Sequence, residues 1–288
     1  MPPWIAQHLT VTADWVRSLQ AQPKLWLRAK RGQGLALAQS IGESWIPDES
    51  EFADAVEFSG VEDLFRSPEF QSGDFEVQDI ASQAVGLLCH PRPGETWWDA
   101  CAGEGGKTLH LSDLMQNKGL IWASDRAAWR LKQLKLRAGR AKCFNYRAVA
   151  WEGGAKLPTK AKFDGVLVDA PCSGVGTWQR NPHARWTTNE NDVRELAVVQ
   201  ANLLAHAARG VKPGGKLIYS VCTLTRAETT EVADAFAKAA PEFASLPLSV
   251  LKGCDGKKIR TTEGDERLRI WPRDLGGNGM FIAAWQRR

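Results

Sequence analysis

The stretch FDGVLVDAPCSGVGTWQRNPHARW, residues 163–186, joins a short apolar run directly to a turn-rich segment. The apolar residues 166–168 are typical of a buried central strand of a parallel sheet, which the following Asp, Pro, Ser and Gly end. Asp169 and Cys172 therefore lie at the carboxyl end of that strand, the edge at which open α/β sheets bind ligands. They indicate a reactive site, although a capping carboxylate beside an inert buried thiol gives the same pattern.

Length and composition indicate a folded globular protein. The 288 residues allow one large domain and a smaller one, and 43% apolar with 24% charged residues is ordinary usage. No apolar run has the length of a membrane span, and the N-terminus lacks the pattern of a leader peptide. Six cysteines without paired CxxC spacing favour reduced thiols. We therefore expect a cytoplasmic protein without a membrane segment.

The net charge of +4 is unevenly distributed. Residues 1–72 carry six basic and ten acidic side chains, a net −4, which leaves +8 for residues 73–288. A basic excess suits a polyanionic partner, but +8 is also unremarkable for a solvated surface. We expect a small N-terminal α+β domain over residues 1–72, with a helix at 4–20 and a strand at 25–30. The cations beside Trp26 could contact nucleic acid or cover an exposed sheet face.

After residue 76, expected strands and helices alternate, which is the signature of a doubly wound parallel sheet and an α/β domain over residues 73–288. Strands are expected at 96–101, 120–124, 143–151, 163–168, 216–221 and 280–285. Helices are expected at 77–88, 107–117, 126–140, 193–209 and 226–239.

The sequence WWDACAGEGGKT, residues 97–108, places Gly103, Gly105 and Gly106 in a turn between a strand and a helix. Glycines there let a ligand approach backbone N–H groups. The spacing matches neither GxGxxG nor the P-loop, so a nucleoside ligand of another class fits better. Asp125 ends the second strand, where an acid reaches a ribose hydroxyl pair or simply caps the next helix.

A third strand end carries a thiol. In KPGGKLIYSVCT, residues 212–223, Cys222 follows a strand, so Cys101, Cys172 and Cys222 share one edge of the expected sheet. Scattered core cysteines would not be expected to cluster there. A zinc site would need a fourth ligand and close ligand spacing, and neither is apparent. We therefore expect no metal.

Four motifs together are highly specific. DAPCSGVGTWQRNP and YSVCT, preceded by DACAGEGGKT and FRSPEFQSGDFEVQDIASQ, closely resemble the RNA cytosine-5 methyltransferases of the NOL1/NOP2/Sun (RsmB-like) family over about residues 65–285. The resemblance implies a Rossmann-like, S-adenosylmethionine-dependent methyltransferase sheet, mostly parallel with one antiparallel strand. It also implies S-adenosylmethionine as cofactor and structured RNA, ribosomal or transfer, as substrate. We expect a monomer.

The residue patterns and the resemblance together predict two overlapping sites. The predicted catalytic residues are Cys222 as nucleophile, Cys172 as the thiol that assists product release, Asp169 and Lys107. The predicted cofactor-binding residues are Cys101, Ala102, Gly103, Glu104, Gly105, Gly106, Lys107, Asp125, Glu152 and Asp169. The chain departs from the family pattern at Glu104, Val221 and Glu152, where Pro, Thr and Asp are usual, and in NGMF at 278–281. None of these departures removes a catalytic group.

The implied reaction explains the thiols. Carbon 5 of cytosine is a poor nucleophile until a group adds to carbon 6, and covalent catalysis supplies that group. An unperturbed thiol with a pKa of about 8.5 is only about 3% ionised at pH 7, so a cation must lower the pKa of Cys222. Lys107 and the cofactor's sulfonium are the candidates. Asp169, when protonated, could hydrogen-bond N3 of the base.

Two segments are candidate RNA contacts. The expected helix at 126–140 carries only basic charged residues, which suits phosphates or a solvated surface equally. These are Arg126, Arg130, Lys132, Lys135, Arg137 and Arg140. After Cys172, the cations Arg180, His183 and Arg185 lie among Trp178 and Trp186, which favours a flipped base and its phosphates over a packed loop.

Two other functions stay open. The chain could be an RNA-binding assembly factor that holds the cofactor without needing turnover. It could also methylate an exocyclic amine, but that chemistry would need an aromatic clamp after Asp169, where this chain has Pro171 and Cys172.

Overall fold

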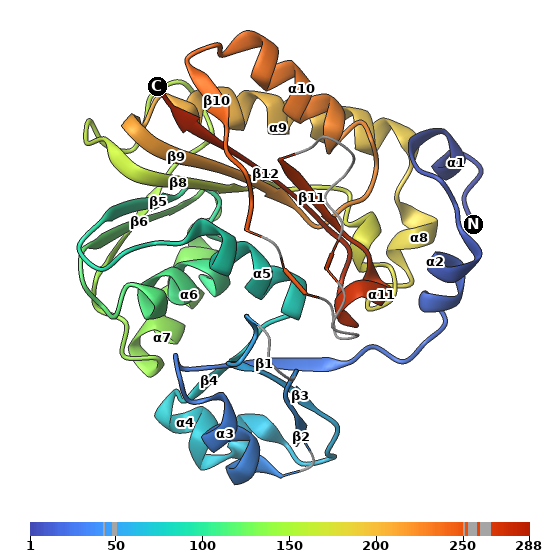
Figure 1. Cartoon of the computed structure of the whole chain (residues 1–288), viewed down its shortest axis with the longest axis vertical. Helices are drawn as coiled ribbons and strands as arrows, with labels where there is room; N and C mark the ends of the chain where they lie inside the picture. The colour runs from blue at the N-terminus through green and yellow to red at the C-terminus, as the bar shows by residue number, and fades with distance from the viewer. Residues whose placement is uncertain (43, 48–50, 250, 253–257, 260–265) are drawn as a thin grey trace.

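The computed structural model places a large sheet between two layers of helices, with a smaller sheet beside it (Figure 1). It describes residues 1–42, 44–47, 51–249, 251–252, 258–259 and 266–288. Cys254, one of the six cysteines, lies outside the described residues. None of the described helices combines the length and the apolar character that a bilayer crossing requires.

The large sheet is mostly parallel. Its strands are β5 (Thr96–Asp99), β6 (Leu120–Asp125), β7 (Tyr146–Ala150), β8 (Phe163–Asp169), β9 (Val211–Val221), β10 (Phe243–Ser245), β11 (Arg267–Ile270) and β12 (Met280–Arg287). Their order is β10-β12-β9-β8-β5-β6-β7, with β11 also paired to β12. Strands β7, β6, β5, β8 and β9 pair in parallel, whereas β12 is antiparallel to each of its neighbours. The predicted Rossmann-like sheet with one antiparallel strand is therefore confirmed.

Helices cover both faces of this sheet. On one face lie α5 (Ile80–Cys89), α6 (Gly106–Leu114) and α7 (Ala128–Arg140), and on the other lie α9 (Glu190–Ala208) and α10 (Thr230–Ala239) (Figure 1). Because helices bury both faces of the sheet, the side chains that point to either face are apolar. The central strands are therefore continuous apolar runs in the sequence. Each fully buried aliphatic side chain contributes about 1.5–3 kcal/mol.

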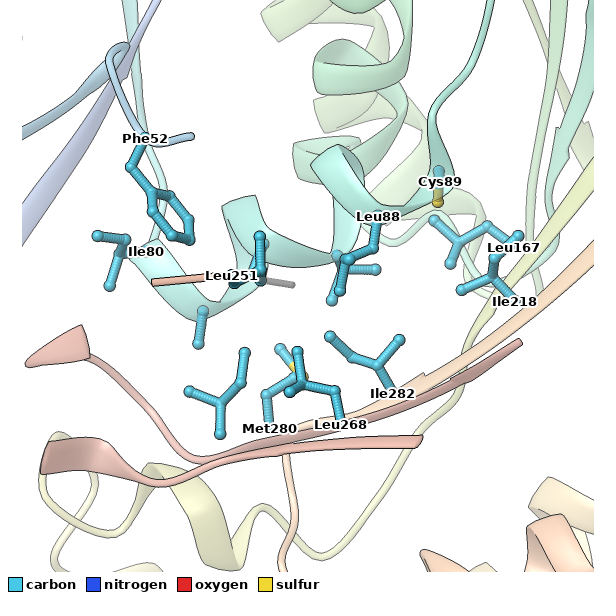
Figure 2. Close-up of a cluster of buried hydrophobic side chains, with 14 of the residues drawn as sticks. Phe52, Ile80, Leu88, Cys89, Leu167, Ile218, Leu251, Leu268, Met280 and Ile282 are labelled. Carbon is cyan, nitrogen blue, oxygen red and sulfur yellow. The ribbon is translucent and has the colours of Figure 1, made fainter. Parts of the chain in front are cut away.

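The alternation is visible within single strands. In β8, Leu167 packs in the cluster beneath α5, whereas Val166 and Val168 pack with α9 and α10. Figure 2 shows the α5 side, where Ile80 and Leu88 lie over the side chains of the sheet. The core is thus divided by the sheet into two layers.

A small antiparallel sheet precedes the large one. Its order is β2-β3-β1-β4, and α3 packs against it. The elements are β1 (Leu25–Ala29), α3 (Gly34–Ile41), β2 (Ser44–Trp45), β3 (Ala55–Phe58), η1 (Leu64–Arg66), α4 (Pro68–Ser72) and β4 (Phe75–Val77). Arg28 of β1 joins this sheet to the large domain, because its guanidinium donates to Gln78 at 2.7 Å and to Asp113 of α6 at 3.3 Å. Both contacts are made by a side chain that is almost fully buried.

The first two helices pack elsewhere. These are α1 (Ile5–His8) and α2 (Ala13–Ser18), and they lie beside three short elements of the large domain (Figure 1). The three elements are η2 (Val175–Thr177), α8 (Ala184–Thr187) and α11 (Pro272–Leu275). Trp15 of α2 stacks on Trp178 with the ring centroids 6.1 Å apart. Leu224 completes the same buried cluster, so α2 supports the segments that follow β8 and β9.

Three element predictions are corrected by the structure. The helix expected at 4–20 is two helices, because Thr12 has extended backbone angles and caps α2 by accepting from Trp15 N. The helix expected at 77–88 begins only at Ile80, since Val77 pairs with Leu27 in β4. The strand expected at 216–221 begins earlier, at Val211, and includes Gly214 and Gly215.

The division of the chain at residues 72 and 73 stays a prediction. Strand β4, just after that point, pairs with β1 and so belongs to the small sheet.

Candidate active site

The carboxyl ends of β8 and β9 bring two thiols into contact. The strands pair in parallel with Asp169 opposite Ser220, so the segments that follow them leave the sheet side by side. Cys172 comes three residues after Asp169, and Cys222 directly follows β9. Their Sγ atoms lie 3.4 Å apart, within hydrogen-bond distance for sulfur.

A partly buried ion pair lies at the same sheet edge. Lys107, in the first turn of α6, donates from Nζ to Asp169 Oδ2 at 2.6 Å, and Ser220 Oγ donates to Asp169 Oδ1 at 2.8 Å. Burial alone would lower the pKa of Lys107, but the charge of Asp169 outweighs it and the pKa is raised. Lys107 therefore remains an ammonium, and Asp169 is held through both of its oxygens.

The two thiols have different acidities. The hydrogen bond from Cys172 lowers the pKa of Cys222, and Lys107 adds to that effect against the opposing influence of burial. The same hydrogen bond, followed by burial, raises the pKa of Cys172 well above its usual range. The pair therefore favours a Cys222 thiolate that accepts from a protonated Cys172, and the thiolate is the nucleophilic form.

The glycine turn ends at a helix and leaves space for a ligand. Gly103 and Gly105 have φ values of +54° and +89°, and Gly105 precedes α6. A Cβ at Gly103 would meet nothing within 4 Å, whereas one at Gly105 would lie 2.7 Å from Leu134 Cγ. Asp125 orients the turn, since its Oδ2 accepts from Gly103 N at 3.0 Å and its Oδ1 accepts from Ala127 N at 2.8 Å. The open backbone beside this carboxylate suits a polar ligand.

The other predicted cofactor residues follow the carboxyl ends of β5 and β7, at the same edge of the sheet. Ala102 is buried, and its backbone N donates to Ser124 O at 2.8 Å. Glu104 is exposed, and its carbonyl accepts from Arg137 at 3.2 Å. Gly106 begins α6, and Glu152 is an exposed residue just after β7. Cys101 lies two residues after β5, and burial beside several carboxylates raises its pKa well above the usual range.

Asp99, at the end of β5, was not among the predicted residues. It is fully buried, its Oδ2 accepts from Thr108 Oγ1 at 2.7 Å, and its Oδ1 has no hydrogen-bond partner within the described part of the chain. Burial raises its pKa to about 7, and the charge of Asp169 adds to the rise. Asp99 ends β5 just as Asp169 ends β8, and this shared position in the sequence could have identified it as a site residue.

Only some side chains of the two candidate RNA-binding segments are free to contact RNA. Arg137 and Arg140 of α7 form ion pairs with the buried Glu76, so these cations are structural. Trp178 is fully buried, contrary to the expectation of an open aromatic surface, because its ring packs among the N-terminal helices. Trp186 is 68% exposed and remains available. Among the described residues, no group of three or more His, Cys, Asp or Glu side chains is arranged to hold a metal ion.

Comparison with known proteins gives concordant relatives. A family model described as 16S rRNA methyltransferase RsmB/F matches residues 86–286. The chain is 37% identical over 221 residues to the probable ribosomal RNA small subunit methyltransferase B of Bacillus subtilis (strain 168), which covers 76% of this chain and 49% of that protein. The chain spans about half the length of the curated relatives it matches.

Solved structures share the fold. One described as "Crystal Structure of PH0851" superposes with a TM-score of 0.86 at 28% identity, over 99% of this chain and 66% of that chain. A methyltransferase homolog protein from Pyrococcus horikoshii superposes with a TM-score of 0.79 at 24% identity, over 94% of this chain and 89% of that chain.

A pH prediction follows from Asp99. Its folded-state pKa of about 7 is above the unfolded value, so its contribution to stability is present at low pH and is lost as the pH rises through 7. The free energy of unfolding should therefore lose about 2 kcal/mol from this group between pH 5.5 and pH 8.5. Asp99→Asn, which keeps an acceptor for Thr108, should remove that loss. Urea unfolding of both proteins at the two pH values measures it, and equal pH slopes would contradict the assignment.

A second prediction concerns the thiol pair. Cys172→Ala removes the donor to the Cys222 thiolate, so the pKa of Cys222 should rise by about one unit, the equivalent of one hydrogen bond to a charged group. The rate of Cys222 alkylation by iodoacetamide, followed by peptide mass spectrometry, should then increase only at higher pH. Cys89→Ala, a buried thiol on α5, is the control and should leave the profile unchanged. An unshifted profile in Cys172→Ala would show that the contact does not tune Cys222.

Proposed function

The chain belongs to the RsmB/F family of 16S rRNA methyltransferases, and on that basis we propose that it transfers a methyl group to C5 of cytosine in structured RNA. The proposed enzyme is an RNA (cytosine-5-)-methyltransferase that works through a covalent bond between Cys222 and C6 of the base. The observation that carries the proposal is the contact of the two thiols, 3.4 Å apart, at the carboxyl edge of the sheet. A single nucleophile would not need a second thiol there.

The resting pair favours attack by Cys222. Its lowered pKa, caused first by the hydrogen bond from Cys172, increases the thiolate fraction at neutral pH. Addition of the thiolate to C6 forms the S–C6 bond and moves electron density onto C5, which then becomes nucleophilic. When bound, S-adenosylmethionine supplies the electrophilic methyl group.

Product release requires loss of the proton on C5. A base takes that proton, the C5–C6 double bond re-forms, and the S–C6 bond breaks with the electrons returning to Cys222. The pKa of Cys172 is raised first by its hydrogen bond to Cys222. Once the Cys222 sulfur is bonded to carbon and no longer carries charge, this cause disappears. The pKa of Cys172 then falls, so more of it is present as the thiolate, which is the form that can accept the C5 proton.

The Lys107 and Asp169 pair has a positioning and electrostatic task in this proposal. The ammonium lies at the sheet edge beside Cys222 and opposes the effect of burial on the thiolate. Asp169, fixed by Lys107 and Ser220, is the proposed hydrogen-bond partner of N3 of the base. A preorganised charge pair needs little rearrangement as charge develops during the reaction.

The site fits the proposed cofactor. The open backbone at Gly103 and the carboxylate of Asp125 beside it offer polar groups to a ligand with ribose hydroxyl groups and an amino acid moiety. Asp125 would hold the ribose, and the turn at Gly103 would contact the remainder. Glu152 is proposed to lie near the adenine, since it follows β7, next to β6 in the sheet.

The RNA contacts are proposed on charge and exposure. In α7, Arg130, Lys132 and Lys135 are exposed cations, and Trp186 offers an exposed ring after Cys172. Stacking on an aromatic ring and contact with phosphates suit an unpaired base in a folded RNA. A monomer located in the cytoplasm, with an N-terminal domain that could also contact RNA, stays a prediction. The assembly-factor alternative is not favoured by any contact described above, and the next experiment distinguishes it.

Covalent trapping tests the two thiols separately. Cys222→Ala should give neither methylated RNA nor a protein–RNA species that survives denaturation, because no bond to C6 forms. Cys172→Ala should accumulate that species with RNA and S-adenosylmethionine, because release is slowed. The double variant should behave like Cys222→Ala. Denaturing gels with a cytosine-containing RNA are the measurement.

The outcomes of that experiment have distinct meanings. An adduct in Cys222→Ala but not in Cys172→Ala would reverse the two roles. Methylation that neither substitution affects would refute the covalent mechanism. An assembly factor would form no adduct in any of the three variants.

The cofactor assignment is tested at Asp125. Asp125→Ala should weaken S-adenosylmethionine binding by about 1.5–3 kcal/mol, the range for a hydrogen bond to a charged group. Asp164→Ala is the matched control, since Asp164 accepts from Thr96 N and Lys212 at the opposite ends of the strands and should not change the affinity. Calorimetry on folded samples measures both. Unchanged affinity in Asp125→Ala would remove Asp125 from the site.

A further inference from the structure

Glu228 is a buried acid behind the two thiols. It follows Cys222 in the turn that leads from β9 into α10, and none of its surface is exposed. Burial of a carboxylate is costly unless hydrogen bonds replace the lost water. Its partners therefore show what this residue is used for.

Both carboxylate oxygens accept from uncharged donors. Oε1 accepts from Ser173 N at 2.8 Å and from Gln200 Nε2 at 3.0 Å. Oε2 accepts from Thr223 Oγ1 at 3.1 Å, from Thr225 Oγ1 at 2.8 Å and from Ser173 Oγ. Five hydrogen bonds to one buried group fix it and its donors in a single arrangement.

The donors come from the two segments that carry the thiols. Ser173 directly follows Cys172, and Thr223 directly follows Cys222. The two hydroxyl oxygens lie 3.0 Å apart, so one hydroxyl group can donate to the other in place of its bond to Glu228. Glu228 therefore connects the residue after each thiol to one acceptor.

Helix α9 supports the Cys172 segment from its other side. The amide of Gln200, fully buried, donates to Pro171 O at 2.9 Å as well as to Glu228. The single O–H of Tyr219 in β9 donates to Glu228 O at 2.7 Å, and Gln200 Oε1 lies 3.1 Å from the same hydroxyl oxygen. Cys172 is thus held through both of its chain neighbours.

We propose that Glu228 is a positioning residue that holds the Cys172 and Cys222 segments together, so that the two sulfur atoms stay in contact. The inference rests on the proposed function for its role in catalysis, but the geometry it predicts can be measured without methyl transfer. The β8 and β9 ladder ends at the pair Asp169 and Ser220, and beyond it a backbone hydrogen bond from Gly176 N to Cys222 O at 3.1 Å also joins the two segments. The Glu228 contacts continue that alignment past the end of the strands.

The donor set determines which substitutions of Glu228 keep the hydrogen bonds. Ser173 N and the Gln200 amide are donors at Oε1 that cannot reverse, whereas the hydroxyl groups at Oε2 can donate or accept. Glu228→Gln can therefore keep the bonds at its carbonyl oxygen and donate from its amide to the hydroxyl groups. Glu228→Ala removes every bond and leaves the donors unsatisfied.

Disulfide formation between Cys172 and Cys222 measures the spacing of the thiols directly. The reduced full-length chain is treated with diamide, a two-electron thiol oxidant that accepts both thiol protons as the S–S bond forms, and the disulfide is quantified by peptide mass spectrometry. Loss of a fixed contact should slow this reaction in Glu228→Ala by roughly tenfold or more, with Glu228→Gln close to the unsubstituted chain. The alkylation profile of Cys222 should move to higher pH in Glu228→Ala.

Asp113→Ala is the matched control, because it also removes a partly buried acid, which pairs with Arg28 far from the thiols. It should lower stability without slowing disulfide formation. If Glu228→Ala does not fold, Glu228→Asp carries the same test, since its shorter side chain cannot span both segments. Disulfide rates equal to the unsubstituted chain in the folded Glu228 variants would overturn the proposal.

Methylation assays keep the two proposals separate. If disulfide formation is slower in the Glu228 variants but the unsubstituted chain methylates no RNA, the positioning role is supported and the proposed function is contradicted. If the unsubstituted chain methylates RNA but the Glu228 variants form the disulfide at an unchanged rate, the proposed function is supported and the positioning role is contradicted.

Discussion

The parallel pairing of β8 with β9 is the constraint on which the site depends. It places Asp169 opposite Ser220, and the next residues of both strands leave the sheet at the same edge. A register shift by one residue would exchange the two faces of a strand, so the buried layers on both sides of the sheet specify this register strongly. The proximity of the thiols is therefore a consequence of core packing as much as of local sequence.

The polar groups at the carboxyl edge of the sheet fix the positions of neighbouring residues more than they stabilise the fold. A partly buried ion pair such as Lys107 with Asp169 loses solvation as it gains attraction, so its net contribution to stability is small. The same holds for Glu228, which has no charged donor among its five described hydrogen bonds. Such groups are costly to leave without hydrogen bonds, so the observed arrangement of their donors is strongly preferred over alternative arrangements. The proposed thiol chemistry would benefit from that selectivity, because the direction of the hydrogen bond between the two thiols determines which sulfur carries the negative charge.

Much of the large sheet could be predicted from sequence because its signals are local. The apolar run before Asp169 and the glycine turn after β5 identify strand ends without knowledge of any partner. Long-range contacts were the source of the errors. Val77 reads as part of a helix but pairs with Leu27, and Arg137 reads as a free cation but pairs with Glu76. Glu228 lies in an ordinary polar segment, and its importance depends on donors from three separate parts of the chain.

The packing of α2 has a consequence for how the protein is made. Trp15 is synthesised early, but the side chains that bury it, Trp178 and Leu224, follow only after most of the sheet has been translated. Until then its apolar surface has no native partner, and such surface favours aggregation of a nascent chain. The first helices can therefore dock in their native place only after Leu224 has been synthesised, against the segments that follow the two thiols. The order of synthesis and the order of assembly are reversed at this end of the chain.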